Sequence, residues 1–316
     1  MQTLLITRRL PDAVLAAARA RFDVTLRDDT APMTTAEMVA ALATYDAILP
    51  TLGDALQADA FTGPVRIRLL ANFGVGYNHI DVAAARAAGV AVSNTPGAVT
   101  EATADIALTL MLMTCRRAGE GERMVRGGTW AGWHPTQLLG QHVSGKVVGI
   151  VGMGRIGKAI ARRCHFGFGM QVVFHNRSTI ADPGVPAQQL GTLDKVASVC
   201  DVLIAAVPAT PETYHLIGAG VFAEMRETAV FVNIARGDIV DETALIAALQ
   251  SGQIAGAGLD VYEFEPKVPE TLKAMENVTL LPHLGTATLE VRTAMGLMAL
   301  DNLVTFFKGQ PLPNPV

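Results

Sequence analysis

The sequence has few of the features that mark a secreted protein. Only 3 of its 316 residues are cysteines, and none forms a CxxC pair. Cys115, Cys164 and Cys200 each stand in apolar sequence, so we expect reduced, buried thiols in a cytoplasmic protein rather than a disulfide framework. The first nine residues place their charges after a short apolar stretch, which is the wrong order for a secretory signal.

Long apolar runs and long basic runs are also missing. The most apolar segment, residues 106–113, is far below the ~20 residues that a membrane-spanning helix requires. The formal net charge is −4 and no long stretch is basic, which argues against nucleic acid as a partner. No low-complexity segment or short-period repeat is present. We therefore expect a globular protein with neither membrane nor nucleic acid as a partner.

What the sequence does contain is enough apolar residue for two α/β domains. The chain is about twice a typical domain length, and 50% of its residues are hydrophobic. Strand and helix patterns alternate in two series, as in open α/β sheets. Strands are expected at 3–7, 23–26, 46–49, 68–71 and 90–93, then at 147–151, 170–175, 202–206, 229–233 and 256–260. Helices are expected at 11–22, from the Thr34-x-x-Glu37 capping box, at 100–117, from 155 to about 163, from Asp241 to about 250, and at 286–308.

A glycine-rich turn directly follows the first strand of the second series and opens a helix. Its glycines, Gly152, Gly154 and Gly157, have the spacing Gly-x-Gly-x-x-Gly. The first allows a tight turn, the second lets the backbone approach a pyrophosphate, and the third lets helix and strand pack closely. The helix N-terminus at Arg155 and Ile156 supplies amide donors for phosphate oxygens. In this context the motif predicts a dinucleotide-binding site, the alternative being glycines that only build a tight turn.

The end of the next strand indicates which nucleotide binds. Asn176 stands about 20 residues beyond Gly157, where an acidic residue usually accepts hydrogen bonds from the NAD ribose. Asparagine removes the charge repulsion against a 2′-phosphate, while Arg177 and Ser178 offer that group a guanidinium and a hydroxyl. We therefore expect NADP(H) in preference to NAD(H). The alternative is a solvated arginine beside an asparagine that caps the strand end.

Three polar segments end or follow later strands of the second series, and each holds one residue suited to acid–base or anion chemistry. These residues are Arg236, Glu265 and His283. Carboxyl ends of strands line the ligand crevice in open α/β sheets, so the three side chains are expected to converge beside a nicotinamide. The other six histidines have no comparable setting and are expected to be surface or packing residues. For His134, beside Trp133, the alternative is a position near the active site of a partner subunit.

Together with segments elsewhere in the chain, these residues resemble a known family. The matching segments are Asn72–Gly76, Ser93–Gly97, Glu101–Asp105 and Leu281–Thr288. They resemble, in the right order and over nearly the whole chain, the D-isomer-specific 2-hydroxyacid dehydrogenases, most closely the glyoxylate/hydroxypyruvate reductase branch.

The resemblance implies an α/β protein of two doubly wound parallel-sheet domains, with a Rossmann cofactor domain inserted into a flavodoxin-like substrate domain. Residues 1–98 and 287–316 would form the substrate (catalytic) domain, and residues 99–286 the dinucleotide-binding domain. It also implies a homodimer that pairs through the cofactor domain and residues 130–135.

The three polar residues suit the reduction of a 2-keto acid, which needs a hydride at C2 and a proton at the developing alkoxide. His283 is the candidate acid, and a nearby Glu265 carboxylate would favour its imidazolium and orient the ring. Arg236 would grip the substrate carboxylate through paired donors and polarise the keto oxygen. The structural alternatives are a salt-bridged strand cap for Arg236, a solvated turn residue for Glu265, and a packing role for His283.

The resemblance implies further contacts. Backbone amides of Val75 and Gly76 would complete the carboxylate clamp, and Leu52, Trp133 and Met295 would set the size of the pocket. The cofactor would contact the following residues in addition to the glycine turn and Asn176–Ser178: Thr103, Val207, Pro208, Thr213, Ile234, Ala235, Arg236, Asp260, His283 and Gly285. Of these, Asp260 would bind the nicotinamide amide, and no metal ion is expected.

Two classes of function are consistent with these residues. The first is NADPH-dependent reduction of glyoxylate to glycolate and of hydroxypyruvate to D-glycerate, with a bulkier 2-keto acid as the alternative substrate. The second is a nucleotide-sensing regulator of the corepressor kind, which shares the fold. An intact Arg236, Glu265 and His283 favours the enzyme.

Overall fold

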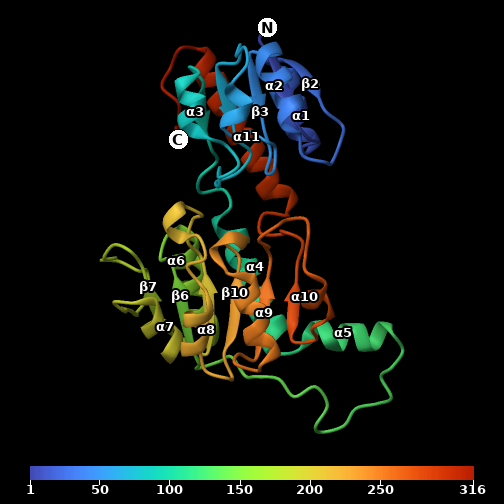
Figure 1. Ribbon diagram of the computed structural model, residues 1–316, viewed down its shortest axis with the longest axis vertical. Coiled ribbons are helices and arrows are strands. Elements are labelled where there is room, and N and C mark those ends of the chain that lie inside the picture. Colours follow the sequence, from blue (N-terminus) through green and yellow to red (C-terminus); the bar gives the residue numbers. More distant parts are fainter. The chain divides into compact units, whose positions relative to one another are not determined.

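The chain folds into two compact units, one inserted into the other. The computed structural model describes all residues, Met1–Val316. Unit 1 comprises Met1–Val99 and Thr286–Val316, and unit 2 comprises Thr100–Gly285. In Figure 1 the blue and red ends of the chain therefore share unit 1, whereas the green to orange middle builds unit 2. These bounds lie within one residue of those expected, and the roles of the two units stay predictions.

Unit 1 is built on a five-stranded parallel sheet. Its strands are β1 (Thr3–Ile6), β2 (Asp23–Leu26), β3 (Ala47–Leu49), β4 (Leu69–Ala71) and β5 (Ala91–Ser93), in the order β2-β1-β3-β4-β5. This 2-1-3-4-5 order is that of flavodoxin, which confirms the predicted fold. Every neighbouring pair is parallel, so all five carboxyl ends meet at one edge of the sheet.

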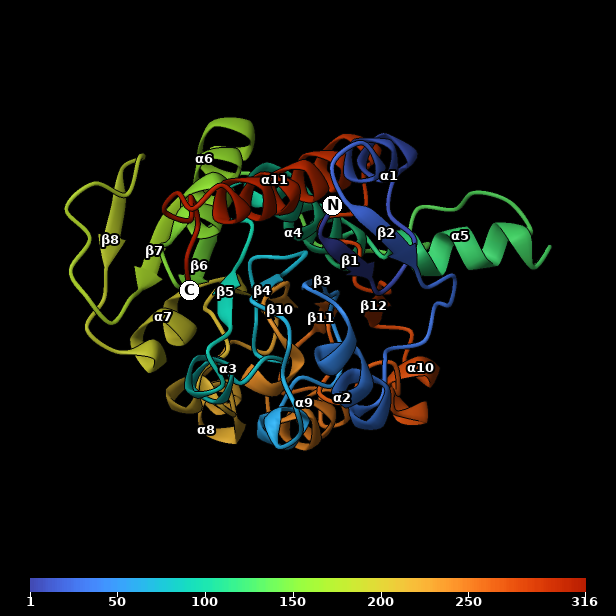
Figure 2. The same ribbon diagram turned by 90° about the horizontal axis from the view of Figure 1, so that it is seen from above.

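Helices cover both faces of this sheet because successive strand side chains alternate between the faces. Leu4 and Ile6 of β1 pack with α1 (Asp12–Arg19) and α11 (Leu289–Phe307), whereas Leu5 faces the opposite side. That side is covered by α2 (Thr35–Thr44), α3 (Val82–Ala87) and the 3₁₀ turn η1 (Ala58–Phe61). Figure 2 shows α1 and α11 on one face of the unit 1 sheet and α2 and α3 on the other.

Unit 2 is built on a seven-stranded parallel sheet. Its strands are β6 (Val147–Val151), β7 (Gln171–His175), β8 (Ala187–Gln189), β9 (Val202–Ala205), β10 (Val230–Asn233), β11 (Gly256–Leu259) and β12 (Val278–Leu280). They lie in the order β12-β11-β10-β9-β6-β7-β8. Strand order reverses at β6, which has β7 on one side and β9 on the other, and this is the switch point of a Rossmann sheet.

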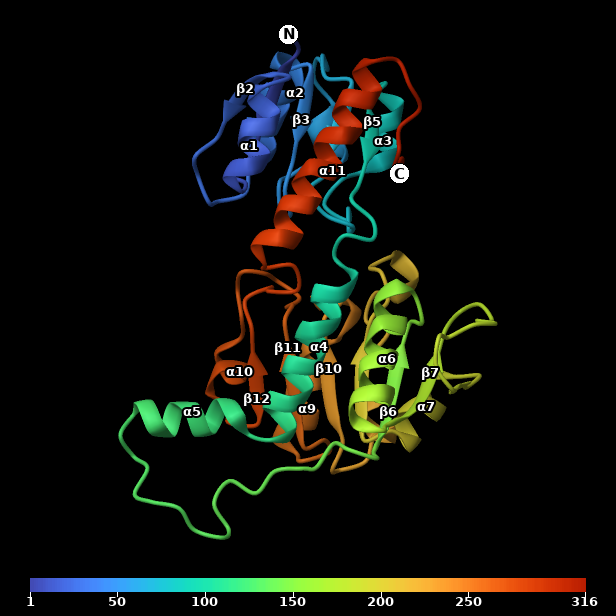
Figure 3. The ribbon, with the colours of Figure 1, turned by 180° about the vertical axis from the view of Figure 1, so that it is seen from behind.

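Helices again cover both faces. On one face α4 (Thr100–Cys115) and α6 (Arg155–Phe168) lie side by side, as Figure 3 shows. On the other lie α7 (Leu193–Val199), α8 (Ala219–Glu224) and α9 (Glu242–Gln250). The remaining helices are α5 (Ala118–Arg126) and α10 (Glu270–Ala274), with 3₁₀ turns η2 (Pro211–Thr213) and η3 (Gly237–Ile239). The three free cysteines are all buried in this unit, as expected.

Local sequence explains most helix ends. The predicted capping box is present at α2, where Thr34 Oγ1 accepts from the Glu37 N–H at 3.3 Å and Glu37 Oε2 accepts from the Thr34 N–H at 2.8 Å. Asp241 caps α9 through the Ala244 N–H. The predicted end of α6 near residue 163 is wrong, because the helix continues to a left-handed Gly169 with φ of +61°.

Two structural details have no local pattern that predicts them. The edge strand β8 is only three residues long and reads Ala-Gln-Gln, without apolar alternation. Helix α5 buries none of its residues. None of the helices combines the length and the apolar character needed to cross a bilayer.

Candidate active site

The residues expected to bind the cofactor lie where the strands of the seven-stranded sheet end. Because all of these strands are parallel, their carboxyl ends lie along one edge. Gly152 and Gly154 follow β6, Asn176–Ser178 follow β7, Val207 and Pro208 follow β9, Ile234–Arg236 follow β10, Asp260 and Glu265 follow β11, and His283 and Gly285 follow β12. Arg155, Ile156 and Gly157 begin α6, Thr103 lies in the first turn of α4, and Thr213 ends η2.

The glycine turn has the geometry that a pyrophosphate requires. Gly152 has φ of +97°, and a Cβ there would stand 2.7 Å from the Val207 side chain. A Cβ at Gly157 would overlap the Gly152 carbonyl oxygen, so the third glycine allows α6 to pack against the turn. Gly154 differs, because no atom lies within 4 Å of the position of its Cβ. That open space at the N-terminus of α6 fits a phosphate group.

The Asn176 side chain joins the glycine turn to the segment after β7. Its Oδ1 accepts from the Met153 N–H at 3.1 Å, and its Nδ2 donates to Ser178 Oγ at 3.1 Å. A hydrogen bond from Thr210 lowers the pKa of the exposed Glu212 carboxyl below its usual range, and the positive charge of Arg177 adds to this. Arg177 and the η2 turn therefore border the same region of the surface.

His283 and Glu265 form a hydrogen-bonded pair. His283 Nδ1 lies 2.9 Å from Glu265 Oε2, and Glu265 Oε1 accepts from the Tyr262 N–H at 3.0 Å. Burial opposes the ionisation of Glu265, but the hydrogen bond and charge of His283, the Tyr262 N–H and the Arg236 guanidinium outweigh it. The pKa of Glu265 consequently lies below its ordinary value, and the group is a carboxylate at neutral pH.

Asp260 holds the turn that carries His283. Its Oδ1 accepts from the Leu284 N–H at 2.6 Å, and its Oδ2 from the Gly285 N–H at 2.8 Å. Its carbonyl oxygen accepts from the His283 N–H at 2.9 Å. His283 has a left-handed backbone with φ of +54°, which is uncommon for a residue with a side chain, so these three bonds hold it there. Burial raises the pKa of Asp260 above its ordinary value despite the two N–H donors.

Arg236 extends from a short turn after β10. Asn233 fixes this turn, because its Nδ2 donates to the Arg236 carbonyl at 2.9 Å and its Oδ1 accepts from the Ala235 N–H at 3.0 Å. Burial lowers the pKa of the Arg236 guanidinium below its ordinary value, although the charges of Glu265 and Asp238 oppose this shift. An arginine remains a cation under all such conditions. Arg236, Glu265 and His283 thus form one electrostatic cluster, as expected.

In unit 1 the residues expected to bind substrate also follow strands. Leu52 lies after β3, and Val75 and Gly76 lie after β4. Asn72 Nδ2 donates to the carbonyl oxygens of Gly74 and Gly76, at 3.1 and 3.0 Å, and so holds the second loop.

Two charged residues in unit 1 have no counterpart in the sequence prediction. Arg8 donates to the Leu52 carbonyl at 2.8 Å and forms an ion pair with the fully buried Asp54 at 3.4 Å. Asp54 also accepts from the Thr51 N–H at 2.8 Å and the Met33 N–H at 2.9 Å. They hold the loop that contains Leu52. The only local signal for them is that Arg8 lies two residues after β1 and Asp54 five residues after β3.

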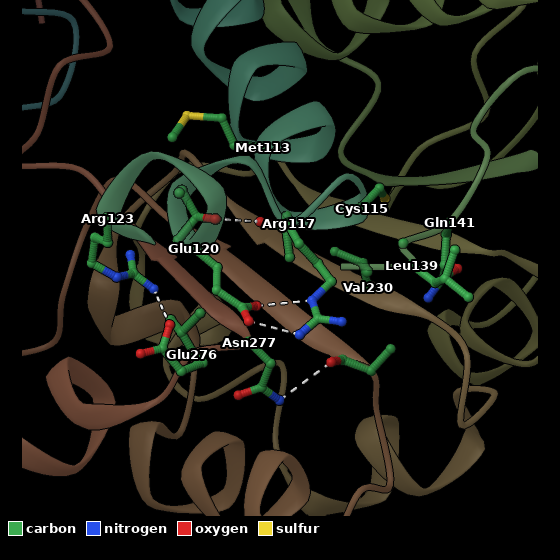
Figure 4. A pocket seen from close by; sticks show the side chains of 16 residues that line it. Met113, Cys115, Arg117, Glu120, Arg123, Leu139, Gln141, Val230, Glu276 and Asn277 are labelled. Atoms are coloured by element: carbon green, nitrogen blue, oxygen red, sulfur yellow. Dashed lines mark hydrogen bonds and ion pairs between the residues drawn. The ribbon is translucent and has the colours of Figure 1, made fainter. Parts of the chain in front are cut away.

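A cavity of about 330 Å³ lies in unit 2 at the amino ends of β10, β11 and β12 (Figure 4). Its charged side chains are paired with one another, Arg117 with Glu120 and Arg123 with Glu276. None of the residues expected to bind substrate or cofactor lines it. No group of three or more His, Cys, Asp or Glu side chains is arranged to hold a metal ion.

Comparison with known proteins identifies relatives over the whole chain. The family profile "D-isomer specific 2-hydroxyacid dehydrogenase, NAD binding domain" matches residues 108–285. A glyoxylate reductase of Thermococcus onnurineus is 40% identical, over 99% of this chain and 95% of its own. A glycerate dehydrogenase of Hyphomicrobium methylovorum is 37% identical, over 97% of this chain and 96% of its own.

A solved structure has the same fold. It is that of an NADPH-dependent glyoxylate/hydroxypyruvate reductase from Sinorhizobium meliloti in complex with NADP and malonate. The TM-score is 0.89 and the identity 36%, over 100% of this chain and 96% of the other.

The space beside Gly154 gives a test of dinucleotide binding. In Gly154→Ala the added methyl group meets no protein atom but enters the space expected for the pyrophosphate. We expect the dissociation constant for the dinucleotide to rise about tenfold or more, which is a loss of about 1.4 kcal/mol or more. Nucleotide fluorescence titration measures this. Gly167→Ala in the same helix, also with open space around it, is the matched control. Equal dinucleotide affinities in Gly154→Ala and Gly167→Ala would show that the phosphates do not bind beside Gly154.

Proposed function

The chain belongs to the D-isomer specific 2-hydroxyacid dehydrogenase family, and from this we propose that it reduces glyoxylate to glycolate and hydroxypyruvate to D-glycerate, with NADPH as the hydride donor. The observation that carries this proposal is the His283–Glu265 pair in the same cluster as Arg236. The names of the relatives, glyoxylate reductase and glycerate dehydrogenase, support small 2-keto acids as substrates.

His283 acts as the general acid in this proposal. Its Nδ1 is engaged by Glu265, which leaves Nε2 to donate a proton to the developing alkoxide. The ionised Glu265 stabilises the imidazolium and fixes the plane of the ring. The bound nicotinamide would supply the hydride to C2 of the keto acid. Asp260 holds the backbone of the acid in place, so its carboxylate serves His283 as well as the nicotinamide amide.

Substrate binding is assigned to Arg236 and to residues of unit 1. The Arg236 guanidinium pairs with the substrate carboxylate and polarises the keto oxygen. The amides of Val75 and Gly76 add donors to that carboxylate, and Leu52 limits the size of the substituent at C2. Residues 1–98 and 287–316 are accordingly the substrate domain, and residues 99–286 the dinucleotide-binding domain.

The preference for NADPH is assigned to the segment after β7. Asn176 adds no negative charge there, and its hydrogen bonds to Met153 and Ser178 hold the segment against the glycine turn. Arg177 is then the cation for the 2′-phosphate and Ser178 a hydroxyl donor. The Sinorhizobium meliloti reductase, whose structure contains NADP, is consistent with this preference.

We further propose a homodimer in the cytoplasm. Helix α5 buries none of its residues, and Trp130 and Trp133 in the following loop are 52% and 79% exposed, so this arm has apolar surface for a second copy of the chain. Burial raises the pKa of the Cys115 thiol to about 11 and those of Cys164 and Cys200 to about 12. Such unreactive free thiols suit a reducing compartment.

Initial rates test the activity directly. Glyoxylate, hydroxypyruvate, pyruvate and a bulkier aryl 2-keto acid are each assayed with NADPH and with NADH at the nicotinamide absorbance. We expect the fastest turnover with NADPH and glyoxylate or hydroxypyruvate. Turnover confined to the bulkier acid would assign a different substrate. Tight dinucleotide binding without turnover of any acid would contradict the enzyme and favour the nucleotide-sensing regulator.

The general acid is tested by His283→Ala. Removing the proton donor should lower kcat by about 100-fold or more, while the affinity for NADPH stays nearly unchanged. Steady-state kinetics and a nucleotide titration on the same preparation separate the two effects. If turnover survives at the wild-type rate, His283 is not the acid.

The cofactor preference is tested by Arg177→Ala. Loss of a charge-assisted contact should weaken NADPH binding by about 1–3 kcal/mol and leave NADH binding nearly unchanged. The exposed Arg162 of α6, replaced by alanine, is the control for a change in net charge. Equal losses for both cofactors would contradict the contact with the 2′-phosphate.

A further inference from the structure

Two histidine–glutamate pairs meet on a single turn after β11. Glu265 pairs with His283, and Glu263, two residues earlier, pairs with His215. His215 Nε2 lies 2.8 Å from Glu263 Oε1, and the Glu263 side chain is only 10% exposed. From the sequence we expect His215 to be a surface or packing residue, and the structure gives it the same kind of carboxylate partner that His283 has.

The second pair ties this turn to two other segments. The His215 N–H donates to the Asp238 carbonyl in η3 at 2.9 Å, and the Glu263 N–H donates to Glu242 Oε1 of α9 at 3.1 Å. His215 has a left-handed backbone with φ of +49°, and its ring stacks on that of Tyr214 at 4.0 Å. An uncommon backbone of this kind is retained only where its surroundings hold it.

Close packing links the same turn to the one that carries Arg236. A Cβ at Gly237 would overlap the peptide group between Tyr262 and Glu263, so the two backbones are in direct contact. In the preceding peptide group, the Tyr262 N–H donates to Glu265 Oε1. Any displacement of the Glu263 peptide therefore reaches Arg236 on one side and Glu265 on the other.

The charges around this pair require a cation or a strong donor. Glu242 accepts from the backbone N–H of Glu263, and the carboxyl groups of both residues are mostly buried. Burial raises the pKa of Glu242, and the charge of Glu263 raises it further. The His215 imidazole is the group that pairs with Glu263 on its other side. A buried carboxylate that loses its partner is costly, so removing His215 should displace the turn.

We propose that His215 and Glu263 are positioning residues of the active site, whose hydrogen bond fixes the turn that aims Glu265 at His283 and supports the turn of Arg236. The inference rests on the proposed function. Neither residue is assigned a contact with the reacting atoms, and both act through Glu265 and Arg236.

The experiment compares His215→Asn and Glu263→Gln with a control. His165→Asn is the control, since His165 is a histidine of the same unit whose Nδ1 lies 3.2 Å from the Met170 carbonyl, before β7. We expect the two test variants to lower kcat/KM for glyoxylate by about tenfold to hundredfold, through a lower kcat and a higher KM. NADPH affinity and the unfolding temperature should stay near those of the control variant. The kcat/KM of the double variant should be no lower than that of the less active single variant, because both changes remove the same hydrogen bond.

The pH profile separates positioning from simple electrostatics. Replacing His215 removes a group that is positive when protonated, so electrostatics alone would move the basic limb of kcat/KM to higher pH or leave it in place. Displacement of Glu265 instead destabilises the imidazolium of His283 and moves that limb to lower pH. The other titratable groups in contact with the pair are Tyr214, whose ring stacks on that of His215, and Glu242, which accepts from the Glu263 N–H, and both are unchanged in His215→Asn.

A second readout does not depend on turnover. Nitrogen-15 NMR of the His283 imidazole, assigned through His283→Ala, follows its protonation directly. A lower midpoint in His215→Asn supports the proposal, and an unchanged or higher midpoint overturns it. Wild-type protein without keto-acid turnover would overturn the proposed function, while this titration would still decide whether His215 positions Glu265.

Discussion

Parallel pairing of every strand in the seven-stranded sheet is the constraint on which the candidate site depends. It brings the carboxyl ends of all seven strands to one edge, so that residues far apart in the chain share one surface. The glycine turn follows β6 at the switch point, and Arg236, Glu265 and His283 follow β10, β11 and β12. Had one of these strands run antiparallel, its candidate residue would lie at the opposite edge, which carries the cavity of paired charges.

Short turns after the strands fix the positions of the candidate residues at this edge. Three backbone groups converge on Asp260, and they hold His283 in a left-handed conformation that few residues adopt. Gly237 lies against the Tyr262–Glu263 peptide so closely that no side chain fits there. His283 and its carboxylate partner Glu265 therefore lie on backbone that is fixed by hydrogen bonds and packing. Preorganisation of this kind lowers the reorganisation needed during a reaction.

The family of the chain and the geometry of its candidate site agree, and each rests on different observations. The family rests on similarity along nearly the whole chain and on a match over residues 108–285. The chemistry rests on a histidine, a carboxylate with a lowered pKa and an arginine in one cluster. Membership implies a reaction on 2-hydroxy or 2-keto acids, and the residues after β3, β4 and β7 are those assigned to the choice of acid and of nucleotide.

The sequence by itself determined the α/β class, most strands, the glycine turn and the choice of Arg236, Glu265 and His283 as candidate site residues. Each of these depends on a local pattern, such as an apolar run followed by glycines or by a polar segment. The tertiary structure alone decided that His215 meets Glu263, that both oxygens of Asp260 bind the His283 turn, and that Arg8 holds the Leu52 loop. These partners come from separate segments of the chain and have no common periodicity. Only the packing of strands and turns brings them within hydrogen-bond distance.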